Sequence, residues 1–298
     1  MFSSRVIKDK IASKLMLTLA IALALILLLI IFGLIIKSYP ILKENSFWSL
    51  ITSSDWHPLK GQFGMLPFIM GTLWVTGLSI IIAVPTCLLT AIYLSEYAKA
   101  RILNFVNPLI DILAGIPSVV FGLWGVVFII PLIREYLAPL LGVSLTGYSI
   151  LAGGLVLSIM IVPVIVHVLN EVFKAVPLEL REASLSLGAT KWQTIKLVVL
   201  KKAMPGVIAA IVLGLSRAFG ETMAVLMVVG NVVKIPHSLL DPGYPLPALI
   251  ANNYGEMLSI PTYDSALMFS ALILLIIVVL FNVFSRFALV RIERMVGG

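Results

Sequence analysis

Arg217 and Glu221 place two opposite charges four residues apart inside an apolar stretch that runs from 205 to 229. On insertion scales, an arginine in the middle of a membrane-spanning helix costs on the order of 2.5–3.5 kcal/mol, so its side chain must face a partner or a water-filled cavity. Residues four apart share a helix face, so one interpretation is a structural ion pair. The other is an anion site, because a guanidinium fork matches the oxygens of an oxyanion.

The order of the two residues favours the anion site. Arginine before glutamate is the less favourable order for a helical pair, and a buried pair often adds no stability over apolar residues of similar size. We therefore predict that Arg217 contacts a passing anion and that Thr222 lines the same pathway. Glu221 is predicted to orient Arg217 and to weaken its charge, so that the anion can leave.

The composition indicates an integral membrane protein. Of the 298 residues, 60% are hydrophobic and 12% are charged, whereas about a quarter of the residues of a soluble domain are charged. The net charge of +7 therefore needs no nucleic-acid partner, and its placement along the chain matters more. Cys87 is the single cysteine, which excludes an internal disulfide and a cysteine-rich metal site, and no metal is expected.

Six apolar runs are each long enough to cross a hydrocarbon core of about 30 Å as a helix. Helices are required because every backbone donor must be satisfied without water. The predicted fold is an all-α membrane protein of six transmembrane helices. Residues 1–65 form an N-terminal anchor with an outer loop, and 66–298 form the main transmembrane domain. The runs are 15–36, 66–94, 105–130, 148–169, 205–229 and 265–287.

Lysine and arginine orient the chain, because cytoplasmic loops carry an excess of these residues. With the N-terminus inside, the four cytoplasmic segments hold 15 of the 21 basic residues and the three outer loops hold five. Both termini are therefore predicted to be cytoplasmic. The largest cytoplasmic loop lies between the fourth and fifth spans.

The third run contains residues that interrupt a helix, namely Gly115, Pro117 and Gly122, with Ser118 directly after the proline. Proline removes a backbone hydrogen bond, and glycine lets another backbone approach closely. Backbone groups freed at membrane depth face either protein or a water-filled cavity. We predict that these residues line a polar passage, although ordinary kinking and small-residue packing would give the same pattern.

A short helix is predicted in the largest cytoplasmic loop, which reads PLELREASLSLGATKWQTIKLVVLKKAMPG over 177–206. Pro177 suits the start of a helix, and acidic residues such as Glu182 suit its early turns. Gly188 suits its end, where a left-handed backbone favours glycine. These start and stop signals exceed what a connector needs. The alternative is an amphipathic helix that lies on the membrane.

Glu182, Ala183 and Gly188 resemble the EAA motif of permease subunits of binding-protein-dependent ABC importers, whose order is Glu-Ala-x-x-x-x-Gly. Ser184 replaces the usual second alanine, and the proline that usually follows the motif is missing at its expected place. The stretches LAGIPSVVFGLWG (113–125) and RAFGETMAVLMVVGN (217–231) are similar to phosphate permeases of the PstC type. The resemblance implies a MetI-like type I importer fold. In that fold a coupling helix, between the fourth and fifth spans, inserts into a cleft of a separate ATPase.

The resemblance also implies the partners of the chain. They are a second, PstA-type permease, two cytoplasmic PstB-type ATPases, an extracytoplasmic PstS-type phosphate-binding protein and the lipid of a bacterial or archaeal inner membrane. The chain would form half of the translocation pathway and bind no cofactor of its own, since the partner ATPase uses the ATP.

Other classes of function lack their residues in this sequence. An enzyme would need a catalytic set, but the three histidines stand in separate segments and no HExxH or GxSxG motif occurs. A self-contained pump would need a GxxxxGK[ST] phosphate-binding loop, which is also missing. The remaining alternatives are a permease for sulfate or molybdate and, less favoured, a passive anion channel.

Overall fold

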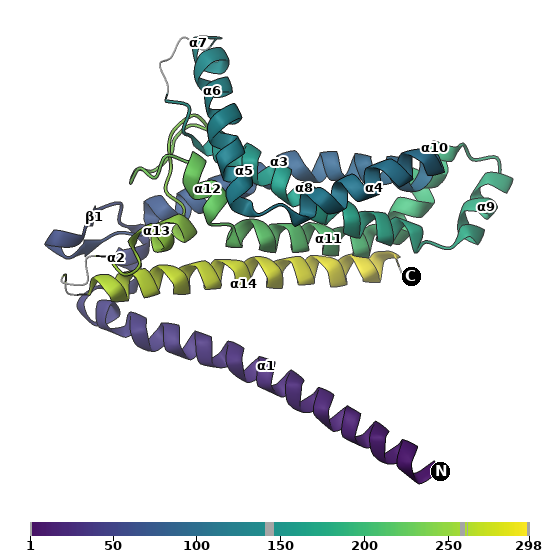
Figure 1. Ribbon diagram of the computed structural model, residues 1–298, viewed down its shortest axis with the longest axis horizontal. Helices are drawn as coiled ribbons and strands as arrows, with labels where there is room; N and C mark the ends of the chain where they lie inside the picture. The colour runs from purple at the N-terminus through teal and green to yellow at the C-terminus, as the bar shows by residue number, and fades with distance from the viewer. Residues whose placement is uncertain (1, 141–145, 257–259, 261, 297–298) are drawn as a thin grey trace.

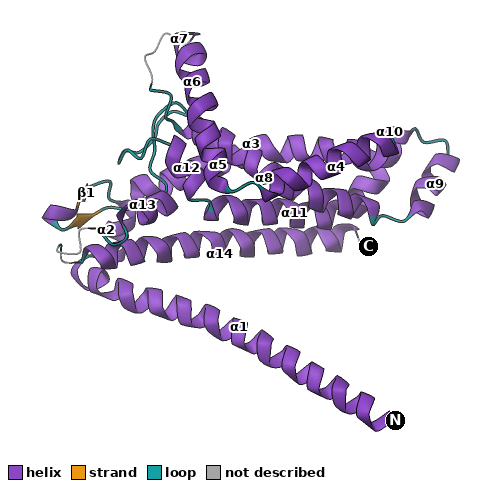
Figure 2. Ribbon diagram, in the orientation of Figure 1, coloured by secondary structure: helices purple, strands orange, loops and turns teal. Residues whose placement is uncertain are grey.

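The computed structural model describes residues 2–140, 146–256, 260 and 262–296, and helices make up most of it (Figures 1 and 2). The strands in these residues form one short antiparallel hairpin. In chain order the elements are α1 (Phe2–Glu44), α2 (Phe47–Thr52), β1 (Trp56–His57), η1 (Pro58–Lys60), β2 (Gln62–Phe63), α3 (Leu66–Ile92), η2 (Tyr93–Tyr97), α4 (Ala100–Gly115), α5 (Ser118–Trp124), η3 (Gly125–Ile129), α6 (Ile130–Leu132), η4 (Ile133–Leu137), α7 (Ala138–Leu140), α8 (Ile150–Lys174), α9 (Leu178–Ser186), α10 (Lys191–Thr194), η5 (Ile195–Val199), α11 (Leu200–Gly220), α12 (Met223–Val228), α13 (Leu246–Asn253) and α14 (Tyr263–Val296).

Six helices in the described part of the chain are long and apolar enough to cross a membrane, which confirms the predicted number of spans and the all-α fold. Short π-helical turns join some of the elements above into longer continuous helices. The six are Lys8–Glu44, Leu66–Tyr97, Ser118–Leu140, Ile150–Lys174, Lys191–Gly220 and Tyr263–Phe287.

The third crossing helix differs from its predicted bounds. The chain breaks at Ile116 and Pro117, and the helix that is long enough to cross runs over Ser118–Leu140. Residues 131–140, which were expected in an outer loop, are therefore helical. A proline disfavours the helical conformation of the residue before it, and Ile116 is extended with φ −68° and ψ 128°. The residues around this break stay apolar, so hydropathy does not reveal it, which explains why the predicted bounds of the third span were wrong.

The fifth crossing helix is also displaced from its predicted position at 205–229. It begins at Lys191, where Thr190 and Gln193 form a reciprocal capping box. It continues past Pro205 and ends at Gly220. The apolar residues that follow belong to the separate helix α12. The predicted span was therefore too short at one end and ran through a break at the other.

Three clusters of buried apolar side chains hold the helices together. The largest joins α3, α8 and α11, and a smaller one joins α5 and α12 to α8. The third ties the end of α1 and the hairpin to α13 and α14, through residues such as Ile41, Phe63 and Phe269. The end of α1 and the residues up to 65 thus share a core with the last helix, while the earlier part of α1 diverges from the bundle (Figure 1).

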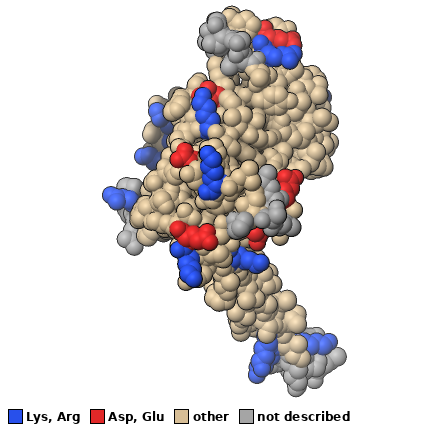
Figure 3. Space-filling model, turned by 90° about the vertical axis from the view of Figure 1, so that its left-hand side faces the viewer, with Lys and Arg blue, Asp and Glu red and all other residues tan. Residues whose placement is uncertain are grey.

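The two ends of the helical bundle differ in character. Both termini and α9 lie at one end, while α2, β1 and α13 lie at the other (Figure 1). Figure 3 shows the molecule from the end with β1, and charged side chains of both signs surround this end face. Most of the visible length of α1 carries no charged side chain before its far tip. This distribution fits helix flanks that face lipid and ends that face water.

Candidate functional site

The helix that carries Arg217 ends three residues later at Gly220, and the chain is extended at Glu221 before α12 begins. Glu221 Oε1 accepts a hydrogen bond of 3.0 Å from the Ala224 amide. The carboxylate therefore satisfies one of the backbone N–H groups that the start of a helix leaves without a partner. The Thr222 hydroxyl donates to the Gly220 carbonyl at 3.3 Å. Both side chains thus stabilise the break between α11 and α12.

The predicted contact between Arg217 and Glu221 is wrong. A four-residue spacing places two side chains together only while the helix continues, and α11 ends between them. Among the described residues there are three ion pairs, none with Arg217, and the Arg217 guanidinium has no hydrogen bond to them either. Arg217 is exposed on the surface of this chain. As far as the described residues go, its guanidinium is free to bind a group from another molecule.

Glu221 faces the inside of the bundle as well as the break. Its half-buried side chain borders a cavity of about 10 Å³, together with Thr72 and Thr76 of α3. The buried Thr72 hydroxyl accepts a hydrogen bond of 2.8 Å from the Leu246 amide and donates to the Phe68 carbonyl. The Thr72 hydroxyl therefore joins the start of α13 to α3 next to the cavity that Glu221 borders.

The predicted break in the third run is present between α4 and α5. Gly115 is the last residue of α4, and Pro117 precedes α5 in an extended conformation. A side chain at Gly115 would meet no atom within 4 Å, so this edge of the break borders open space. Ser118 begins α5 and is half-buried. Whether the break lines a passage stays a prediction.

Gly122 lies inside α5 and not at a helix break, which corrects the prediction for this residue. A Cβ at Gly122 would lie 2.7 Å from Met227 Sδ and 3.1 Å from Ala224 Cα, both on α12. The missing side chain thus lets α5 and α12 pack closely. α5 follows the break at Pro117, and α12 follows the break at Glu221. The two breaks therefore lie at the starts of two helices that pack against each other.

The predicted helix between the fourth and fifth spans is α9, and none of its residues is buried. Gly188 follows it with a φ of +85°, which confirms the predicted left-handed end. The amides of Gly188 and Ala189 donate to the carbonyls of Leu185 and Ser184, at 3.0 and 3.3 Å. These two bonds form a Schellman motif, which satisfies carbonyls at the end of a helix. The loop therefore presents an ordered helix on its surface.

The motif residues Glu182 and Ala183 are exposed on α9, and no described residue pairs with the Glu182 carboxylate. Large apolar side chains are exposed on and beside α9 as well. An exposed apolar patch bordered by polar residues is typical of a partner-binding surface. The exposed apolar residues are Leu178, Leu180, Leu185, Leu187 and Trp192.

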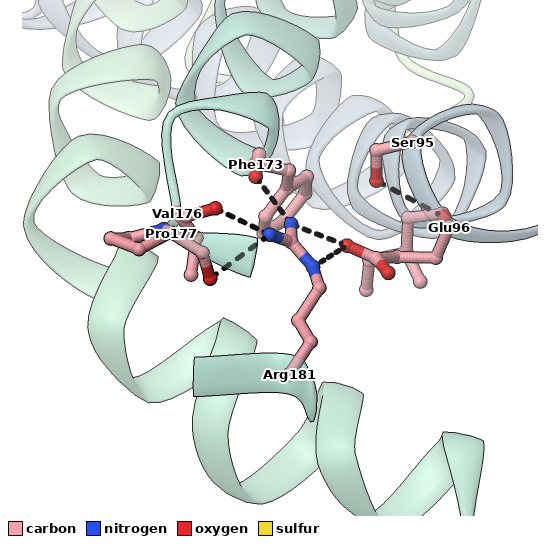
Figure 4. A network of polar contacts seen from close by, with 7 residues as sticks. Ser95, Glu96, Phe173, Val176, Pro177 and Arg181 are labelled. Carbon is pink, nitrogen blue, oxygen red and sulfur yellow. Dashed lines mark hydrogen bonds and ion pairs between the residues drawn. The ribbon is translucent and has the colours of Figure 1, made fainter. Parts of the chain in front are cut away.

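A network of polar contacts attaches α9 to the rest of the protein, and its centre is Arg181 (Figure 4). Arg181 Nη2 donates to Glu96 Oε1 at 2.9 Å and to the Phe173 carbonyl at 2.8 Å. Nε donates to the same carboxylate at 3.3 Å. Nη1 donates to the carbonyl of Val176 and, at 3.5 Å, to that of Pro177. One guanidinium therefore joins α9, η2 and the end of α8.

This network was missed by reasoning from the sequence. Glu96 and Arg181 lie 85 residues apart, so no helical spacing connects them. Glu96 lies just after the second predicted span and Arg181 in the helix predicted for the largest cytoplasmic loop, so their opposite charges on the cytoplasmic side were the one available signal. Charged residues are common in cytoplasmic segments, so that signal does not single out this pair.

Comparison with known proteins identifies the family. A family model described as binding-protein-dependent transport system inner membrane component matches residues 87–297. The chain belongs to this family. It is therefore a multi-pass membrane component of a transport system that depends on a binding protein.

Curated relatives match most of the chain. The phosphate transport system permease protein PstC of Xylella fastidiosa strain Temecula1 is 36% identical over 264 residues, which cover 84% of this chain and 81% of the relative. The probable ABC transporter permease protein YqgH of Bacillus subtilis is 39% identical, over 80% of this chain and 76% of the relative. The probable phosphate transport system permease protein PstC of Methanocaldococcus jannaschii is 31% identical, over 78% of each chain.

A solved structure supports the fold. The inward-facing MetNI methionine ABC transporter matches with a TM-score of 0.56 and 18% sequence identity. The match covers 76% of this chain and 97% of that one. At this identity the likeness concerns the fold alone, and it confirms the predicted MetI-like arrangement.

Proposed function

We propose that this chain is the permease subunit of an ATP-driven importer of inorganic phosphate and forms half of its translocation pathway. The observation that carries the proposal is the unpartnered guanidinium of Arg217, which lies in a membrane-capable helix just before a break. An arginine in such a helix needs a partner or water, and the described residues supply no partner. The relatives named phosphate permeases support phosphate as the anion.

The chemistry of the site suits a phosphate that passes between two subunits. The Arg217 fork can bind two phosphate oxygens at once. Because Arg217 lies on the surface of this chain, the opposite wall of the pathway must come from another subunit, which we take to be a PstA-type permease. Ser118 and Thr222 lie at the starts of the neighbouring helices α5 and α12, where their hydroxyls would face the same passage.

Glu221 favours phosphate over sulfate in this proposal. One carboxylate oxygen of Glu221 accepts the Ala224 amide, which leaves the other oxygen available. Phosphate near neutral pH carries a proton that it can donate to a carboxylate, whereas sulfate carries none. The Glu221 carboxylate would therefore bind the phosphate hydroxyl and repel sulfate, and it would also weaken the attraction of Arg217 enough for release.

The energy for transport comes from a PstB-type ATPase pair that binds α9. The exposed apolar side chains near α9 fit a docking surface, and Leu187 at its end is 89% exposed. Closure of the ATPases around ATP would move α9 and switch the pathway from inward-facing to outward-facing. The outward-facing state would receive phosphate from a PstS-type binding protein. In this proposal α9 and both termini, which share one end of the bundle, lie in the cytoplasm.

Uptake by the purified complex tests the proposal. The complex, with its ATPase and binding protein, is reconstituted in vesicles, and ATP-dependent uptake of phosphate, sulfate and molybdate is measured. We expect Arg217→Gln to assemble and hydrolyse ATP but to take up phosphate roughly 10- to 100-fold more slowly, as the loss of a charged hydrogen bond of about 1.5–3 kcal/mol implies. Arg101→Gln, which changes an exposed arginine on α4, is the matched control.

Three outcomes would contradict the proposal. Uptake of sulfate or molybdate in preference to phosphate would show that the substrate is wrong. Phosphate flux without ATP would indicate a passive channel. Normal phosphate uptake by Arg217→Gln would show that Arg217 does not contact the anion, whatever the substrate is.

A further inference from the structure

We propose that Arg181 and Glu96 form a clamp that makes α9 move as one body with α3 and α8. This inference rests on the proposed coupling role of α9 and concerns how movement of that helix reaches the pathway. In it, Arg181 and Glu96 are positioning residues. They contact neither the anion nor ATP.

The clamp differs in burial from the other ion pairs of the described chain. The side chains of Arg181 and Glu96 are 16% and 9% exposed, whereas those of Lys174 and Glu171 are 48% and 62% exposed. Salt screens exposed pairs strongly and buried pairs much less. The Glu96 carboxylate is therefore held to Arg181 under conditions in which surface pairs separate and re-form.

The guanidinium also binds the end of α8. The last carbonyls of a helix lack partners within it and carry partial negative charge. The carbonyls of Phe173, Val176 and Pro177, at and just beyond this end, accept from Arg181, while Glu96 accepts from the other side of the same fork. A rigid fork with five N–H donors can reach both partners at once, which a lysine ammonium cannot do as well.

Few other contacts attach α9 to the protein. It has no buried residue, so apolar packing contributes little to its position. Ser184 and Thr194 share a hydrogen bond of 2.9 Å, which ties α9 to α10. Lys191 of α10 lies 4.5 Å from the ring centre of Tyr97. Tyr97 and Glu96 belong to the same π-helical segment η2, which continues α3. The contact of Lys191 with Tyr97 and the contact of Arg181 with Glu96 therefore both connect the loop to the end of α3.

The clamped helices lead to the candidate pathway. α3 and α8 share the largest apolar core with α11, which carries Arg217. α8 also shares a core with α5 and α12, the helices that follow the two breaks. Without the clamp, α9 would be held by short chain segments, by the hydrogen bond between Ser184 and Thr194 and by the contact of Lys191 with Tyr97. With it, a displacement of α9 is transmitted through three packed helices at once.

The test compares transport with ATP hydrolysis in the reconstituted complex. Glu96→Gln keeps the size of the side chain and removes its charge, and Arg181→Lys keeps the charge and removes the fork. We expect both variants to retain the ATPase and its activity, and we expect the ratio of phosphate taken up to ATP hydrolysed to fall at least tenfold. Glu171→Gln, which breaks the exposed pair with Lys174, is the matched control and should keep the wild-type ratio.

A distance measurement tests the clamp without relying on transport. Spin labels are placed at Thr90 of α3 and Ser186 of α9, two exposed positions, with Cys87 replaced by alanine. The distance should stay the same in the nucleotide-free and ATP-trapped complexes. In Glu96→Gln it should differ between the two states or become broadly distributed.

The outcomes separate the clamp from the proposed function. If the wild-type complex does not take up phosphate with ATP, the proposed function fails, and the spin-label distances still decide whether α9 and α3 move together. If Glu96→Gln and Arg181→Lys keep the wild-type ratio, or if the wild-type distance changes with nucleotide, the clamp is refuted. If Arg181→Lys fails to assemble with the ATPase but Glu96→Gln assembles, the ratio measured in Glu96→Gln decides whether the clamp is needed.

Discussion

Gly188 offers a sharp test of the role of α9, because its backbone conformation and not its surroundings requires glycine. Its φ is +85°, and a side chain there would meet no atom within 4 Å. Any cost of a substitution therefore comes from the backbone. Residues other than glycine adopt the left-handed conformation at a cost of roughly 1–2 kcal/mol, and asparagine adopts it more readily than most.

The magnitude follows from this cost. We expect Gly188→Ala to destabilise the end of α9 by about 1–2 kcal/mol, which reduces the population of the ordered end about 5- to 30-fold relative to alternatives. Gly188→Val should lie at or above the upper value, because a β-branched residue with positive φ is a genuine outlier. Gly188→Asn should cost least. The loss falls on the two Schellman hydrogen bonds to Ser184 and Leu185, so the rest of the bundle should stay folded.

The assay measures uptake of phosphate per ATP hydrolysed in the reconstituted complex, together with retention of the ATPase on the permease. At equal amounts of inserted protein, we expect the ratio to be highest in Gly188→Asn, lower in Gly188→Ala and lowest in Gly188→Val. A wild-type ratio in Gly188→Val would refute the view that the ordered end of α9 is needed for coupling. An equally low ratio in Gly188→Asn and Gly188→Val would show that backbone conformation is not the cause.

Three further predictions concern other parts of the chain. A cysteine at Ser54 should react with an impermeant thiol reagent from outside intact cells and one at Ser186 should not; labelling of Ser186→Cys would reverse the orientation. Glu221→Gln should keep the hydrogen bond from the Ala224 amide and so the fold, but should let sulfate compete with phosphate, whereas Glu221→Ala should also lower the melting temperature because about 1 kcal/mol of helix capping is lost. The backbone amides of His237 and Ser238 hold the pKa of Asp241 below its ordinary value, so the carboxylate stabilises the fold above the ordinary carboxyl pKa and loses this effect as the pH falls through the lowered pKa. The difference in melting temperature between wild type and Asp241→Ala should therefore shrink in acid, and a difference independent of pH would contradict this.

Much of the fold could be predicted because the signals are local or additive. The six spans follow from hydropathy summed over about 20 residues, a sum that tolerates errors at single positions. The end of α9 follows from Gly188 alone, because few other residues favour its conformation. The break before Ser118 follows from Pro117, although the hydropathy of the surrounding residues hid its effect on the helix bounds.

The parts that could not be predicted depend on the path of the chain in three dimensions. The end of α11 at Gly220 carries no strong stop signal, since glycine also occurs inside transmembrane helices. A continuous helix was therefore assumed, and the pair of Arg217 with Glu221 was inferred from it. The clamp of Arg181 with Glu96 depends on the packing of α3 against α8, which no pattern within either helix determines.

The end of α11 changes the chemistry available to Arg217. In a continuous helix, Glu221 would lie beside Arg217, and a direct ion pair would neutralise the arginine and compete with any anion. Because the helix stops at Gly220, the carboxylate instead binds the amide of Ala224 at the start of α12. Glu221 thus satisfies a backbone amide at the start of α12, and no described residue pairs with the Arg217 guanidinium. A permanent pair would hold Arg217 in one state, whereas an unpaired arginine next to a break can gain and lose an anion as the helices on either side of the break move. In the proposed function, the break is therefore the feature that would allow a charged pair in the sequence to serve transport.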